Sequence, residues 1–171
     1  MTPINLMDFM AKRLQKLLKD YNAKQPSGTV PVTVYPGYFP VQNNAKERNS
    51  MVYVLVTDIV DKQGNDKSHA TVEFGFSIYD DDHTDGWRSL FNVMEHIRQD
   101  ILKFRFVAMK FRLDLEEAPI KMHIPDNQPF PQWLGTMTAS YTIGQPEEEG
   151  FNYDDFQEVQ GYQDYEEYKN H

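Results

Sequence analysis

The chain has 171 residues, of which 40% are hydrophobic and 13% aromatic, and it contains no cysteine. This length suits one domain with an extension, and the lack of cysteine excludes disulfides, thiolate metal sites and a cysteine nucleophile. No apolar run reaches the ~20 residues that span a membrane, and the first residues lack the pattern of a secretory signal. We therefore expect a soluble protein that is made in the cytoplasm and has no membrane partner.

The net charge of −9 is concentrated in the last part of the chain. Residues 147–171 hold nine Asp or Glu and one Lys, net −8, which leaves 17 acids and 16 bases, net −1, for residues 1–146. We therefore divide the chain into a domain, 1–146, and an acidic C-terminal extension, 147–171. An acidic extension repels nucleic acid and suits a basic protein surface.

The extension is also richer in aromatic residues than a purely solvating tail requires. This combination predicts a segment that docks on an adjacent subunit or on another protein. Its aromatic residues are Phe151, Tyr153, Phe156, Tyr162, Tyr165 and Tyr168.

Helical spacing of apolar residues predicts an amphipathic helix from Ile4 to Asp20. Thr2 is suited to be its N-cap and Pro3 to be its first residue. The segment VPVTVY, residues 30–35, predicts a short strand, which its proline places at a sheet edge.

A loop without helical or strand periodicity follows, residues 35–49, and loops of this length usually make functional contacts. Its aromatic side chains are Tyr35, Tyr38 and Phe39. We expect them to take part in an interface.

The apolar run Met51–Val60 predicts a central strand with both faces covered. The next segment, HATVEFGFSIYD, alternates cleanly and predicts an antiparallel hairpin with that strand. Its expected inward residues are Val72, Phe74, Phe76 and Ile78.

A second helix, Trp87–Phe104, is predicted to cover the sheet through one apolar stripe. The stripe consists of Trp87, Leu90, Phe91, Met94, Ile97, Ile101 and Phe104.

Two further alternating segments complete the domain. Residues 109–116 are expected to place Met109, Phe111, Leu113 and Leu115 inward, and Thr136–Ile143 forms the closing strand. The order of elements predicts an α+β fold, in which an antiparallel sheet of four to five strands packs against an N-terminal helix and a central helix.

The turn DDDHTDG, residues 80–86, has two interpretations. As a calcium loop it places Asp81 and Asp85 correctly, but Asn92 stands where a bidentate Glu is required. As a turn into the helix, it lets Thr84 or Asp85 provide the cap. Because no histidine pairing and no nucleophile or phosphate-loop motif is present, we expect no enzyme, no metal site and no cofactor.

The segment KFRFVAMKFRLDL, residues 103–115, mixes basic and aromatic residues as single-strand nucleic-acid surfaces do. Its aromatics fall in the inward phase of the predicted elements, which favours core packing. The basic residues face outward and suit an acidic partner such as the chain's own extension or that of a neighbouring copy. They are Lys103, Arg105, Lys110 and Arg112.

The segment PFPQWLGTMTASYTIGQP, residues 129–146, leads from a proline-rich turn into the last strand. Phe130 and Trp133 have two interpretations: they plug the end of the core, or they anchor a neighbouring subunit.

From the hairpin to Pro146, the chain resembles the tail terminator, or tail completion, proteins of tailed bacteriophages and their prophage relatives. Three features carry the resemblance. They are the acidic turn ending in Asp85-Gly86, the sequence Glu95-His96-Ile97-Arg98 in the helix that follows, and the segment Gln128–Thr138. The acidic extension is not a feature of that family.

The resemblance implies a non-enzymatic α+β subunit that forms a ring, usually a homohexamer, at the head-proximal end of the tail tube. Such a protein is located in the virion, in the tail or neck, and is assembled in the host cytoplasm. Its partners are further copies of itself, the tail tube protein and the head-completion or connector protein, with DNA only as cargo that passes through the lumen. The alternatives are another head–tail connector or stopper, a tail tube protein, a metal-dependent enzyme, or an adaptor that acts through the acidic extension.

Overall fold

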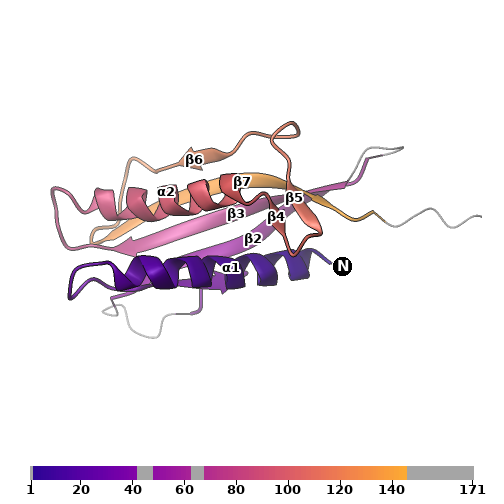
Figure 1. Ribbon diagram of the computed structural model, residues 1–171. Coiled ribbons are helices and arrows are strands. Elements are labelled where there is room, and N and C mark those ends of the chain that lie inside the picture. Colours follow the sequence, from indigo (N-terminus) through magenta and orange to yellow (C-terminus); the bar gives the residue numbers. More distant parts are fainter. Residues whose placement is uncertain (1, 42–47, 63–67, 146–171) are drawn as a thin grey trace, which may run out of the picture.

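The computed structural model describes residues 2–41, 48–62 and 68–145, which form two helices and a seven-stranded sheet (Figure 1). Within these residues no helix is both long enough and apolar enough to cross a membrane. The elements in chain order are α1 (Pro3–Ala23), β1 (Val32–Pro36), β2 (Ser50–Val60), β3 (Ser68–Tyr79), α2 (Trp87–Lys103), β4 (Phe106–Val107), β5 (Phe111–Leu113), β6 (Lys121–His123) and β7 (Gln132–Ile143).

The strands follow the order β1-β2-β3-β7-β5-β4, and β6 also pairs with β7. The predicted α+β class and the β2–β3 hairpin are confirmed, and β1 lies at the sheet edge as expected. The sheet is mixed, since β1 pairs with β2 in parallel, and it has more strands than the four to five predicted. Parallel neighbours need a long connection, which the residues between Pro36 and Ser50 provide, and the short strands β4, β5 and β6 raise the count.

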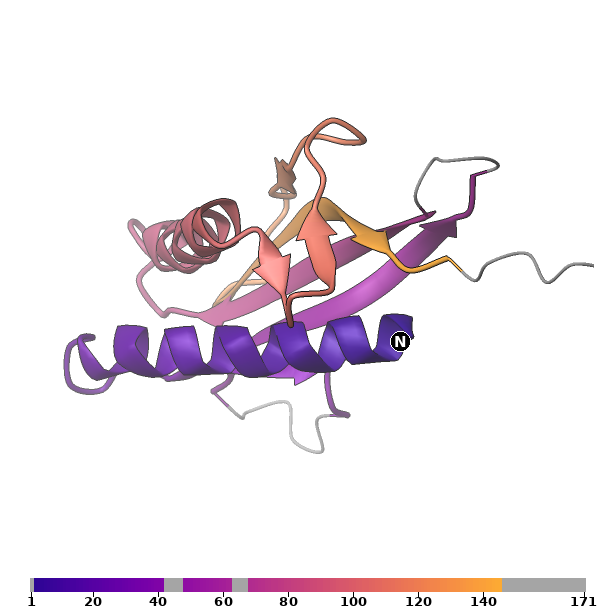
Figure 2. The same cartoon turned by 45° about the vertical axis from the view of Figure 1, so that its right-hand side comes forward.

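Both helices lie on the same face of the sheet, and the core fills the space between them and the strands (Figures 1 and 2). The register places Phe74 opposite Val54 on one side and Met137 on the other, so the inward residues of three long strands form continuous rows. The predicted inward residues of β3 are confirmed as buried: Val72, Phe74, Phe76 and Ile78. The alternation expected of the closing strand buries Met137, Ala139 and Tyr141 of β7, whereas Ile143 at its end is only partly buried.

On the opposite face of the sheet, the Tyr53 ring lies directly over Gly75. A Cβ atom on Gly75 would stand only 2.1 Å from Tyr53 Cε1, so this close approach requires glycine. The Tyr53 hydroxyl donates to Glu73, and Phe39 meets the ring edge to face at 4.9 Å. Burial, followed by the bond to Glu73, raises the pKa of Tyr53.

The prediction that both faces of Met51–Val60 are covered is wrong for its second half. Residues 57–60 are exposed, and the pairing with β3 shifts register between Val56 and Asp58. Such a shift bends a strand and increases its twist. The end of the β2–β3 hairpin therefore projects past the helices (Figure 2).

Arg13 of α1 connects both helices to the chain that leads into β4. Its Nε donates to Asp100 Oδ2 and its Nη2 to the Asp100 carbonyl, each at 2.9 Å. Its Nη1 donates to the carbonyls of Phe104 and Phe106 at 2.8 and 3.2 Å. One guanidinium thus bonds to the Asp100 carbonyl, which also accepts the Phe104 N–H at the end of α2, and to two carbonyls beyond the last helical residue.

We expect Arg13→Lys to lower the free energy of unfolding by about 1–3 kcal/mol, because an ammonium keeps the charge but cannot make the forked set of bonds. Urea unfolding measures this change. The matched control is Arg98→Lys, whose pair with Glu95 at 2.6 Å joins neighbouring turns of one helix at the surface and should cost under about 1 kcal/mol. Equal losses in the two variants would contradict the role of Arg13.

Candidate interaction surfaces at the two ends of α2

Four exposed rings surround the N-terminal end of α2, and we call them the aromatic surface: His83, Trp87, Phe91 and Phe130. His83 stacks on Phe130 with ring centroids 3.8 Å apart, and Trp87 meets Phe91 edge to face at 5.6 Å. Trp87, Phe91 and Phe130 are 40%, 43% and 41% exposed. Rings of this size carry much of the energy of protein interfaces when a partner covers them.

The prediction that Trp87 and Phe91 face the core is therefore wrong. Each residue turns the helix by about 100°, so Phe91 falls on the flank of a stripe centred on Leu90 and Met94. The buried stripe is narrower than predicted and consists of Leu90, Val93, Met94, Ile97 and Ile101.

Trp133 connects the aromatic surface to the core. Its indole is half-buried against the core cluster, and its Nε1 donates to the carbonyl of Asp80 at 3.0 Å. Its ring meets Phe130 edge to face at 6.4 Å. Of the two predicted interpretations, core packing describes Trp133, whereas Phe130 is available to a partner.

The acidic turn is organised by its own backbone. Asp82 Oδ1 accepts the N–H groups of Thr84 and Asp85 at 2.8 and 3.0 Å. These two bonds lower the pKa of Asp82, and the bond from Asp85 has the larger effect. Asp85 pairs with Arg88 at 2.8 Å, and Asp81 is exposed. Among the described residues no group of three or more His, Asp or Glu could hold a metal ion.

The prediction that Thr84 or Asp85 caps α2 is wrong, because Gly86 occupies the N-cap position and no side chain caps the helix. A Cβ atom at Gly86 would lie 2.5 Å from the Asp82 carbonyl oxygen and 2.6 Å from Trp133 Nε1. Packing against Trp133 therefore leaves no room for a capping side chain.

We expect Gly86→Ala to lower the free energy of unfolding by about 1–3 kcal/mol, because the turn and the indole must move apart. In a Trp87→Phe background, tryptophan fluorescence during urea unfolding reports both the stability and the surroundings of Trp133. Gly144→Ala is the matched control, since no atom lies within 4 Å of the place that its methyl group would take, and its stability should hardly change. A neutral Gly86→Ala variant would contradict the close packing.

A basic and apolar surface lies at the other end of α2, which we call the hairpin surface. Phe104, Phe106 and Met109 are 55%, 51% and 84% exposed, so the prediction that they face the core is wrong, while Phe111 and Leu113 are buried as predicted. The hairpin surface consists of Lys103, Phe104, Arg105, Phe106, Met109, Lys110 and Arg112.

A tight turn between β4 and β5 explains the error at Met109. Ala108 and Met109 both adopt left-handed backbone angles, with φ of 50° and 56°, and the Lys110 N–H donates to the Val107 carbonyl at 3.1 Å. Left-handed angles at both central residues are typical of the turn that closes a two-residue hairpin. The turn interrupts the alternation, so Met109 points outward.

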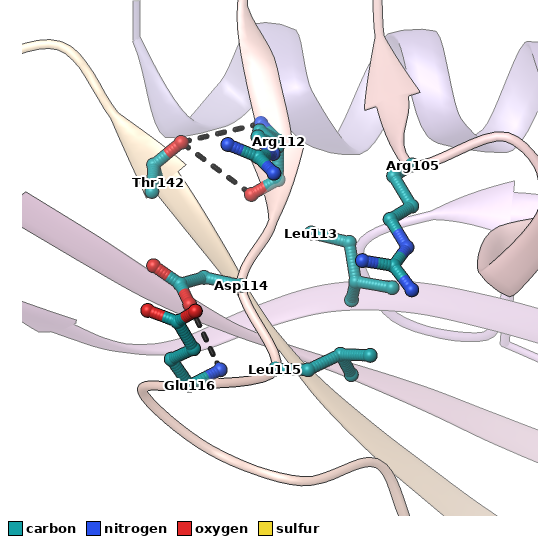
Figure 3. Close-up of a pocket in the computed structure, with 7 residues that line it drawn as sticks. All are labelled: Arg105, Arg112, Leu113, Asp114, Leu115, Glu116 and Thr142. Atoms are coloured by element: carbon teal, nitrogen blue, oxygen red, sulfur yellow. Dashed lines mark hydrogen bonds between the residues drawn. The ribbon is translucent and has the colours of Figure 1, made fainter.

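A pocket of about 130 Å³ opens beside the hairpin surface (Figure 3). Arg105 and Arg112 enter it from the two arms of the hairpin, and Thr142 Oγ1 joins the β5 backbone at Arg112. Pockets for cofactors or drug-sized ligands measure roughly 300–1,000 Å³, so this one suits a single side chain. Its lining is Arg105, Arg112, Leu113, Asp114, Leu115, Glu116 and Thr142.

Asp114 links this pocket to a buried histidine. Its Oδ2 lies 3.1 Å from His69 Nε2, and its Oδ1 accepts the N–H groups of Glu116 and Glu117 at 3.0 and 3.1 Å. Glu117 lies 4.0 Å from His69 Nδ1 and pairs with Lys62 at 2.6 Å. The bond from His69, followed by those from the backbone, lowers the pKa of Asp114.

The Asp114 carboxylate makes the stability of the protein depend on pH in a defined direction. Because the pKa of Asp114 is lower in the folded state, its contribution is complete above the unfolded pKa of ~3.9 and is lost as pH falls through the lower folded value. We expect the stability of Asp114→Asn to fall less steeply below about pH 4 than that of the wild type. Urea unfolding between about pH 2 and 6 measures the slopes, and parallel curves would contradict the assignment.

The remaining predicted interface residues divide into those that the structure describes and those that it does not. Tyr38 is exposed, whereas Tyr35 and Phe39 are half-buried near Tyr53, far along the sheet from β7. Tyr153, Phe156, Tyr162 and Tyr165 lie outside the described residues.

The His69–Asp114 pair was missed by sequence reasoning, because its members stand 45 residues apart and no local pattern joins them. The two ends of α2 did leave a signal. An acidic run precedes this helix and a basic run follows it, so their placement at opposite ends could have been derived from the sequence.

No protein-family model matches the sequence, and no curated protein matches it. One solved structure whose name states no function is similar over 82% of this chain and 97% of its own, with 17% identity and a TM-score of 0.43.

Proposed function

We propose that this protein is a structural subunit of a bacteriophage virion, a tail terminator that forms a ring at the head-proximal end of the tail tube. The observation that carries the proposal is the presence of two unlike exposed surfaces at opposite ends of one helix. A closed ring is built from a head-to-tail contact, in which one surface of each subunit meets a different surface of the next.

The two surfaces are complementary in charge, and both present large apolar side chains. The aromatic surface stands beside an acidic turn, with Asp81 and Asp85 exposed, whereas the hairpin surface carries Arg105 and Arg112. Both expose large apolar side chains between the charges. Opposite charges at the rim give an interface its register, and apolar groups at its centre give most of its affinity.

The separation of the surfaces supports a contact between subunits rather than within one. The 17 residues of α2 span about 25 Å at 1.5 Å per residue, so the two surfaces of one subunit cannot meet. A neighbouring copy can bring its aromatic surface to the hairpin surface, and the repeat of this contact generates a ring or a filament.

The proposed partners follow from the resemblance in the sequence. A terminator ring meets the tail tube protein on one face and the head-completion or connector protein on the other, and DNA passes through its lumen. The α+β architecture with a helix-covered sheet is compatible with that family. No chemical reaction is part of this function.

A charge exchange tests the contact between subunits. We expect Arg105→Glu/Arg112→Glu, and separately Asp81→Arg/Asp85→Arg, to weaken ring assembly by on the order of tenfold or more in concentration, since each places like charges together. The combined variant should recover assembly, because the charges are exchanged and opposite again. Lys19→Glu/Lys24→Glu, which changes the charge equally at the far end of α1, is the control.

Solution mass and negative-stain images of each variant provide the measurement. Discrete rings support a terminator, and long tubes would support a tail tube protein instead. A wild-type protein that stays monomeric at all concentrations would overturn the proposal, as would a combined variant that assembles no better than its parents.

A further inference from the structure

The hairpin surface has more positive charge than its surroundings neutralise. Among the described residues none forms an ion pair with Lys103, Arg105, Lys110 or Arg112. Two carboxylates, of Asp114 and Glu116, line the adjacent pocket, and Asp114 is already bonded to His69 and to two backbone N–H groups. The surface therefore retains a positive charge that an acidic ligand can neutralise.

The same surface exposes apolar groups that are held in place. Lys103 lies 5.2 Å from the Phe104 ring centroid, and Arg112 lies 5.9 Å from that of Phe106, so cations and rings alternate. Arg13 fixes the carbonyls of both phenylalanines. A ligand that matches this surface combines carboxylates with aromatic side chains, because it must neutralise the cations and cover the rings.

The chain itself contains such a ligand, and it begins close by. Thr142 of β7 pairs directly with Arg112 of β5, and the acidic extension starts with Glu147, five residues later, a distance of at most ~17 Å along the chain. Gln145, the last described residue, bonds to the carbonyl of Lys62 at 3.1 Å, so the described chain ends beside the β2–β3 hairpin, on the side of the molecule where β5 lies (Figure 1).

We propose that residues 147–171 dock on the hairpin surface of their own subunit. Their nine carboxylates and six aromatic rings match the cations and the exposed phenylalanines of that surface. The short connection raises the effective concentration of the segment to the millimolar range, which favours its own subunit over a neighbour.

This inference deepens the proposed function. The docking itself does not depend on that function, and only its effect on ring assembly rests on it. The extension and the aromatic surface of a neighbouring copy share one chemistry, acidic residues beside aromatic rings, so they compete for the hairpin surface. The extension then covers this surface in the free subunit and is displaced when the ring forms.

Zero-length cross-linking of the full-length protein, with free subunits separated from rings by size, tests the docking in the free subunit. A carbodiimide joins a carboxylate to a nearby lysine amine as an amide, with loss of water, and mass spectrometry identifies the joined peptides. We expect Lys103 and Lys110 to be joined to acids of residues 147–171 several times more often than Lys19 or Lys24. Mixing unlabelled with ¹⁵N-labelled protein separates links within a chain from links between chains.

Two perturbations should reduce these links severalfold. Arg105→Glu/Arg112→Glu removes the charge match but keeps both reactive lysines, while Lys19→Glu/Lys24→Glu leaves the links unchanged. Raising the salt from about 0.05 to about 0.5 M screens the charges in the unaltered protein, so this result is independent of how well a variant folds.

Links that join different chains, links spread evenly over all lysines, or links that resist both perturbations would overturn the docking. The solution mass of the same samples keeps the two proposals apart. Docking within the chain in a protein that never forms rings refutes the ring alone, and a protein that forms rings but whose free subunits give no hairpin links refutes the docking alone.

Discussion

The course of the chain that leaves α2, at the basic end of the molecule, depends on one guanidinium. Arg13 bonds to the Asp100 carbonyl in the last turn of α2 and holds the two carbonyls that bracket Arg105. Its charge also balances Asp100, whose carboxylate is largely buried and would be costly to leave unpaired. These bonds direct the chain after α2, and together with the pairing of β5 with β7 they give the hairpin and its pocket a defined place.

The sheet and its helices were largely predictable, because periodicity reports burial wherever an element is continuous. Phe74 and Ala139 follow the alternation of their strands, and Leu90 and Ile97 follow the helical stripe. The predictions failed where the backbone changes direction. Two left-handed residues at the β4–β5 turn reverse the phase of Met109, and no alternation rule anticipates such a turn when neither residue is glycine, asparagine or aspartate.

The candidate surfaces were predictable in composition but not in arrangement. Acidic and basic runs flank α2 in the sequence, yet the exposure of Phe104 and Trp87 follows from how narrow the contact between α2 and the sheet is. Gly86 illustrates the same limit, since a neighbouring indole that arrives from β7 decides which residue can stand at the helix start. Long-range pairs such as His69 with Asp114 arise only when β3 and the β5 end are brought together by β7.

Because α2 is one uninterrupted helix, it connects the aromatic surface rigidly to the hairpin surface. The length of the helix fixes the distance between the two surfaces. Its winding fixes the angle, about the helix axis, between the directions in which they face. Adding or removing a single residue changes that angle by about 100° and the spacing by only about 1.5 Å. The closure of any assembly that uses both surfaces is thus far more sensitive to the phase of this helix than to its length, and a whole-turn insertion is better tolerated than a shorter one.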